Sequence, residues 1–81
     1  MKLPGDIGGA ELAKLLELYG YRITRQIGSH IRLTTILKGE HHITIPIHKP
    51  LKIGTLSKIL GDISLHLEIS KEKISEEIFE K

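Results

Sequence analysis

The chain has 81 residues, of which 40% are apolar and 27% are charged, and its formal net charge is +2. A chain of this length builds one small hydrophobic core, which excludes a second domain and a deep cofactor cavity. It contains no cysteine, so disulfides, thiolate zinc ligands and a cysteine nucleophile are excluded and a cytoplasmic protein is favoured. No apolar run reaches the ~18–20 residues of a membrane span, and residues 1–6 lack the apolar core of a signal peptide. We therefore expect a soluble protein without a membrane partner.

The charges are unevenly distributed along the chain. Residues 22–58 contain a single acidic residue, Glu40, whereas the C-terminal tail is rich in glutamate. A basic body of this kind suits a polyanionic ligand such as a nucleic acid, and a merely solvated charged surface is the alternative. Because aromatic residues make up only 4% of the chain, contacts with phosphates and with nucleic acid shape are favoured over base stacking.

The first predicted element is an amphipathic helix that begins at Gly8-Gly9. Apolar residues at helical spacing lie on one of its faces: Leu12, Leu15, Leu16 and Tyr19. Gly20 is predicted to end the helix, because glycine readily adopts the left-handed C-cap conformation.

Three strands are predicted next, as an antiparallel meander from residue 21 to 47. The first two are Tyr21–Gln26 and Ile31–Leu37, joined by a polar turn that ends on His30, and Lys38-Gly39-Glu40-His41 connects the second to the third. Alternation predicts that one set of side chains faces the helices: Tyr21, Ile23, Ile31, Leu33, Leu37, Ile43, Ile45 and Ile47. The opposite set forms a wet, partly basic face: Arg22, Thr24, Gln26, His30, Arg32, Thr34, His42, Thr44, Pro46 and His48. Pro46 places the third strand at a sheet edge, since proline cannot donate to a strand ladder.

A second helix is predicted after a basic loop, with Thr55 as its N-cap. Its apolar positions run at helical spacing from Leu56 to about Leu67, although residues 63–70 also alternate as a fourth strand would. We favour the helix, followed by a last acidic helix capped by Ser70 and anchored by Ile74, Ile78 and Phe79. The predicted fold is thus two-layer α+β.

Several short motifs occur together on these elements: Gly20-Tyr21, Arg25-Gln26, Gly28-Ser29-His30, Pro46-x-His48 and Gly54-Thr55-Leu56-x-x-Ile59-Leu60. In this combination the chain, over roughly residues 3–66, resembles the HicA family of toxins from prokaryotic toxin–antitoxin pairs. The resemblance implies one HicA-like domain over residues 1–81, with a fold similar to a double-stranded-RNA-binding domain, α-β-β-β-α with an extra C-terminal helix. It also implies mRNA cleavage with His30 as the catalytic residue, and a cognate HicB-like antitoxin that covers the active site.

The chemistry of RNA cleavage fits a histidine at this position. Attack by the ribose 2′-hydroxyl needs a base for its proton and an acid for the leaving oxygen, and imidazole titrates near neutral pH. We therefore predict a metal-independent endoribonuclease, an mRNA interferase without cofactors, with His30 as general acid or base. The residues predicted to bind RNA are Gln26, Gly28, Ser29, Arg32, His48, Lys49 and Lys52. Among them, Arg32 is predicted to neutralise charge in the transition state.

Some of these residues have competing explanations. His48 is either the second acid–base group or a strand-end histidine that bonds the loop backbone. Lys49 and Lys52 form a phosphate cradle with the amides of a helix N-terminus, unless Thr55 is simply its cap. Arg25 has inward parity, so it is predicted to brace the turn in preference to contacting phosphate.

Two other functions remain open from the sequence. The first is a non-catalytic RNA-binding module on the same fold. The second is a zinc-dependent hydrolase using His30, His42 and His48, which we do not favour because no carboxylate is expected near that face to orient the rings.

Overall fold

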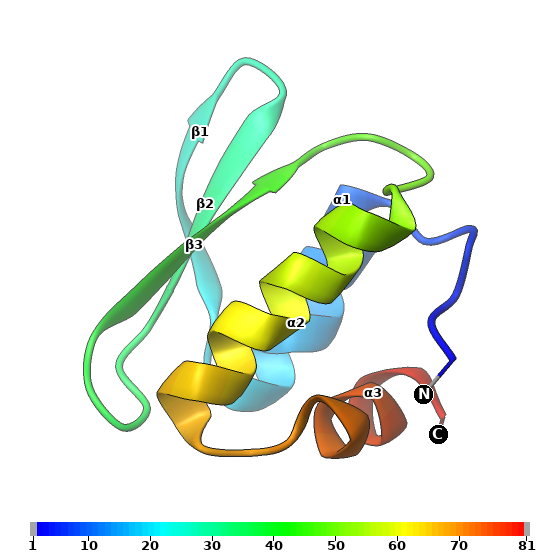
Figure 1. Ribbon diagram of the computed structural model, residues 1–81. Helices are drawn as coiled ribbons and strands as arrows, with labels where there is room; N and C mark the ends of the chain where they lie inside the picture. Colours follow the sequence, from blue (N-terminus) through cyan, green and yellow to red (C-terminus); the bar gives the residue numbers. More distant parts are fainter. Residues whose placement is uncertain (1, 81) are drawn as a thin grey trace.

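The computed structural model describes residues 2–80 and shows a three-stranded antiparallel sheet with helices packed on one face (Figure 1). The elements are α1 (Gly9–Leu15), the short 3-10 helix η1 (Leu16–Tyr19), β1 (Arg22–Ile27), β2 (His30–Thr35), β3 (His41–Pro46), α2 (Ile53–Leu67) and α3 (Lys71–Phe79). This order confirms the predicted α+β fold with an extra C-terminal helix. Among residues 2–80, no helix combines the length and the apolar character needed to cross a bilayer.

The first helical segment buries the face that the sequence predicts. Leu12, Leu16 and Tyr19 are buried, and α1 continues directly into η1. Gly20 ends the segment with a φ of +80°, the left-handed conformation expected of a C-cap glycine. The predicted helix and its end are therefore confirmed.

The sheet is the predicted meander, with β2 in the middle and β1 and β3 at its edges. Most of the predicted inward residues form the core together with the helices: Tyr21, Ile31, Leu33, Ile43 and Ile45. Three of the predicted residues do not join this core, because Ile23, Leu37 and Ile47 are 56%, 48% and 36% exposed. The predicted parity of Ile23 holds, since it pairs with the buried Leu33. For Leu37 and Ile47, which lie outside the strands, the prediction is wrong. β1 is exposed along its whole length, and Leu37 and Ile47 follow the ends of β2 at Thr35 and of β3 at Pro46, so none of the three residues is buried in the core.

Helix α1 lies close to the end of β3. The amide of Gly9 donates to the carbonyl oxygen of His48 at 2.9 Å. A Cβ at Gly9 would overlap the carbonyl oxygen of Pro46, so only glycine allows this approach. Pro46 ends β3 at the sheet edge, as predicted.

The C-terminal third is helical, so the fourth-strand alternative is wrong. Helix α2 buries Leu56, Leu60 and Ile63 and ends where Glu68 adopts a φ of +59°. Ser70 caps α3 as predicted, with its hydroxyl accepting from the amide of Lys73 at 3.1 Å.

The acidic helix α3 packs on the body of the molecule. Ile74 and Ile78 are buried, Lys71 Nζ donates to Ser57 Oγ on α2, and the Tyr19 hydroxyl donates to the Glu77 carboxylate. Burial and this hydrogen bond both raise the pKa of Tyr19. In Figure 1, α3 lies at the end of the molecule away from the tip of the β1–β2 hairpin, so the acidic helix does not cover that tip.

Candidate active site and nucleic-acid interface

His30 is placed by a two-residue turn between β1 and β2. Ile27 pairs with His30 across this turn, and only Gly28 and Ser29 lie between them. Gly28 has a φ of +56°, and a Cβ at this position would meet nothing within 4 Å, so the backbone conformation and not a close neighbour favours glycine here. The carbonyl oxygen of Ser29 accepts from the amide of Ile47 at 2.6 Å, which ties the turn to the chain after β3. The turn is shorter than predicted, and His30 is the first residue of β2.

A β-bulge in β1 changes which side chains share the face of His30. The register runs from Ile23 opposite Leu33 to Arg25 opposite Arg32, which leaves Thr24 as the extra residue. Arg25 and Ile27 therefore lie on the outward face, and Gln26 pairs with Ile31 on the opposite face. The predicted parities of Arg25 and Gln26 are both wrong. The sequence contains one hint, since a strictly alternating β1 would turn the charged Arg25 toward the core.

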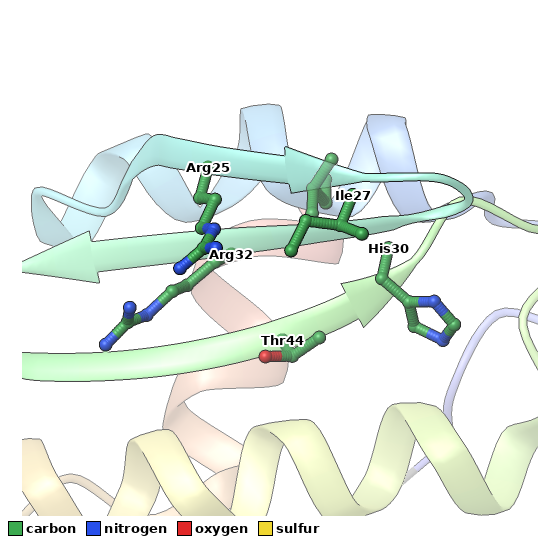
Figure 2. Close-up of a pocket in the computed structure, with 6 residues that line it drawn as sticks. Arg25, Ile27, His30, Arg32 and Thr44 are labelled. Atoms are coloured by element: carbon green, nitrogen blue, oxygen red, sulfur yellow. The ribbon is translucent and has the colours of Figure 1, made fainter.

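The outward face is hollowed beside His30. A shallow hollow of about 310 Å³ is lined by Arg25, Ile27, His30, Ile31, Arg32 and Thr44. Figure 2 shows the side chains of Arg25 and Arg32 extending from neighbouring strands to the same side, with His30 toward the hairpin turn. The structure thus brings together the predicted residues His30 and Arg32. It adds Ile27, which no pattern in the sequence singled out, and Thr44, which alternation had placed on this face without a role in the site. It also adds Arg25, which was predicted to brace the turn.

The ionisable groups of this hollow carry no acidic partner. The ion pairs within residues 2–80 join Lys38 to Glu68, His42 to Glu40, Lys49 to Glu11 and Lys73 to Glu77. None of them includes His30, Arg25 or Arg32, and all three residues are exposed. The hollow is therefore positively charged and open to water, as a site for an anionic ligand requires.

Two predicted binding residues lie beside a different element. His48 and Lys49 line a second, smaller hollow at the start of α1 with Gly8 and Gly9, and neither lines the hollow around His30. Lys49 Nζ pairs with Glu11 Oε1 at 2.8 Å; this contact raises the pKa of Lys49 and lowers that of Glu11. The structure does not bring His48 into the same hollow as His30.

The predicted phosphate cradle is altered at the start of α2. The helix begins at Ile53 with Lys52 as its N-cap, and the amide of Leu56 already donates to the carbonyl oxygen of Lys52. Thr55 is therefore inside the first turn, and its prediction as N-cap is wrong. Lys52 is exposed and does not line the hollow around His30.

His42 is held by its own neighbours on the outward face. Its Nε2 donates to Glu40 Oε2 at 2.7 Å, and its Nδ1 shares a hydrogen bond with Thr34 Oγ1 at 2.8 Å. The expectation that no carboxylate lies near this face is thus wrong. Over the described residues, however, His30, His42 and His48 do not gather into a cluster with metal-binding geometry.

A comparison with protein families identifies the chain's relatives. The family model described as the HicA toxin of bacterial toxin–antitoxin matches residues 9–65, which is most of the chain. The chain belongs to the HicA toxin family. Neither the curated proteins nor the solved structures contain a match. Membership implies a toxin of a toxin–antitoxin system, and therefore an antitoxin as partner.

The family match covers the site and stops before the acidic helix. Residues 9–65 include α1, the whole sheet and the hollow around His30, whereas α3 lies outside the match. The positively charged hollow is thus a feature of the part of the chain that defines the family.

Proposed function

We propose that this toxin is an endoribonuclease that cleaves mRNA through the ribose 2′-hydroxyl, with His30 as the general acid or base. The observation that supports it is the hollow in which an exposed imidazole lies with two guanidinium groups that pair with no carboxylate of residues 2–80. Such a hollow offers both a proton-transfer group and positive charge for a phosphodiester.

The proposed reaction is an internal transesterification. The 2′-oxygen loses its proton and bonds to phosphorus while the bond from phosphorus to the 5′-oxygen breaks, and the leaving oxygen takes up a proton. The products are a 2′,3′-cyclic phosphate and a free 5′-hydroxyl. His30 performs one of the two proton transfers, and the open hollow lets water perform the other. Arg32 neutralises the charge that develops on the phosphoryl oxygens.

The decisive experiment removes the imidazole. His30→Ala is expected to lower the cleavage rate about 10²–10⁴-fold, the contribution of a positioned acid or base. RNA affinity should stay within about twofold, because Arg32, the predicted phosphate contact, remains in place. The assay is run in the presence of a chelator, and the product end is identified as a cyclic phosphate.

His42→Asn is the matched control, since it removes an exposed imidazole from the same sheet face outside the hollow. We expect this variant to cleave at the wild-type rate. Cleavage that disappears with the chelator, and with His42→Asn as well, would support a zinc-dependent hydrolase instead. Tight RNA binding by a wild type that never cuts would support a non-catalytic binding module.

A further inference from the structure

The β-bulge at Thr24 has one clear effect on the surface: it puts two arginines directly opposite each other. Arg25 on β1 pairs with Arg32 on β2, and both side chains project to the face of His30 (Figure 2). Directly paired residues in an antiparallel ladder have Cβ atoms about 4.5–5.5 Å apart, so the two arginine side chains leave the sheet from neighbouring positions. Without the extra residue, Arg25 would face the helix side and the pair would not exist.

This arrangement is unfavourable for the free protein. Like charges directly opposite in a sheet destabilise it. No ion pair in the described part of the chain reaches either guanidinium, although four such pairs form elsewhere on the surface. Bulges occur frequently next to active sites, where they redirect a side chain. A redirected arginine that repels its neighbour is therefore explained best by a ligand that carries negative charge.

We propose that Arg25 and Arg32 together form a clamp for the RNA phosphodiester backbone next to His30, with Arg25 as a binding residue made available by the bulge. The proposal rests on the function above and names the phosphate-binding part of that site. Each guanidinium presents a planar set of donors that matches two phosphate oxygens. Thr44, directly opposite Arg32 on β3, adds a hydroxyl at the floor of the same hollow.

The chemistry of the hollow favours a nucleic acid over an acidic protein segment. The clamp lies in the same hollow of about 310 Å³ as an exposed imidazole and the apolar side chain of Ile27, which is 62% exposed. A phosphodiester with its ribose fits this combination of paired cations, proton-transfer group and apolar contact. A carboxylate-bearing segment would use the cations alone.

The test measures binding apart from cleavage. Arg25→Ala is compared with Arg22→Ala, which removes the same charge from the same strand and face but outside the hollow. The ligand is a single-stranded oligonucleotide with 2′-O-methyl ribose, which cannot be cleaved. Arg25→Ala should weaken its binding about tenfold, equivalent to one lost charged contact. It should also reduce the slope of log affinity against log salt by about 0.7, as loss of one phosphate contact on a single strand does. Arg22→Ala should change the binding free energy and the salt slope by less than half as much as Arg25→Ala does.

A second measurement separates ligand binding from a structural role of Arg25. At low salt without ligand, Arg25→Ala should have a melting temperature equal to or above that of the wild type, because it removes a repulsion. A lower melting temperature together with unchanged oligonucleotide affinity would show that Arg25 braces the turn, and would overturn the proposal. Equal effects of Arg22→Ala and Arg25→Ala on binding would overturn it too.

The remaining outcomes distinguish this clamp from the proposed reaction. A wild type that never cuts RNA but loses affinity with Arg25→Ala would leave the clamp standing and refute the nuclease. If cleavage depends on His30 but Arg25→Ala has no effect on oligonucleotide binding, the nuclease proposal stands and the clamp is refuted. The wild type could also bind hexaglutamate as tightly as the oligonucleotide, with both affinities lost in Arg25→Ala. That result would assign the clamp to an acidic protein and would overturn the proposal that it binds RNA.

Discussion

Histidines lie at both ends of strand β2, but their surroundings differ. At the hairpin end, His30 is exposed beside Arg25 and Arg32, and within residues 2–80 no hydrogen bond uses its ring. At the other end, His41 stacks on His66 with ring centroids 4.3 Å apart and forms a 2.7 Å hydrogen bond to the buried Tyr21 hydroxyl. One end leaves its imidazole available to a ligand, and the other uses its imidazoles to hold the fold together.

At the end of β2 away from the hairpin, His66 connects the β2–β3 turn to the last turn of α2. His66 Nε2 donates to the carbonyl oxygens of Leu37 and Gly39 at 2.8 and 3.0 Å, which fixes the proton on that nitrogen. Burial and the neighbouring His66 lower the pKa of His41. A histidine's role therefore depends on its partners, because a ring whose nitrogens are engaged in the fold cannot also exchange protons with a substrate.

The sharpest way to test this comparison is to remove the histidine on α2. His66→Ala deletes one stacked ring and the donor to two carbonyl oxygens, so we expect the free energy of unfolding to fall by about 1–3 kcal/mol. Chemical denaturation measures this loss. RNA cleavage by the folded variant should stay at the wild-type rate.

Leu65→Ala is the matched control on the same helix, because Leu65 is 82% exposed. Its unfolding free energy should change by less than about 0.5 kcal/mol. If the His66→Ala protein is as stable as the wild type but no longer cleaves RNA, the structural role assigned to this end of β2 is wrong and the end belongs to the active site.

A smaller change at the same end removes a single hydrogen bond. Tyr21→Phe keeps the buried ring and deletes the hydroxyl that bonds to His41 Nδ1. Loss of one such bond should lower the free energy of unfolding by about 1 kcal/mol. Denaturation curves check the value, and unchanged or increased stability would contradict a structural role for this contact.

The smallest expected effect is a pH dependence of stability. The pKa of His41 in the folded protein lies below its ordinary value of 6.5, so between these two values the unfolded chain binds more protons. Stability from His41 is therefore complete above about pH 6.5 and is lost as the pH falls toward the lowered value. Tyr21 and Asp62, together with His42 and His66, are the ionisable groups linked to this end.

The experiment compares unfolding free energies of the wild type and His41→Gln from pH 7.5 to pH 5. The advantage of the wild type over the variant should shrink as the pH falls. A difference that stays constant, or that grows, would show that His41 does not titrate in this way.

Much of this protein could be predicted from its sequence, because local rules decide it. Apolar residues at helical spacing predicted the first helical segment, which is α1 continued by η1, and Gly20 predicted its end. Ser70 predicted the cap of α3, and all three are confirmed. The alternation of β2 and β3 predicted their buried faces, and Pro46 predicted an edge strand. The combination of motifs that includes Gly28-Ser29-His30 indicated the HicA family, which the family match confirms.

Only the tertiary structure decided the faces of β1 and the composition of the hollow. An alternating pattern has a period of two, so one extra residue at Thr24 moves Arg25 and Gln26 to opposite sides from those expected. That extra residue depends on how β1 pairs with β2. The start of α2 was missed as well, because the helix begins at Ile53, two residues before Thr55, the residue predicted to cap it. Local patterns determined the elements of this protein, whereas pairing across strands determined which side chains surround His30, because register is a property of two segments and neither segment encodes it alone.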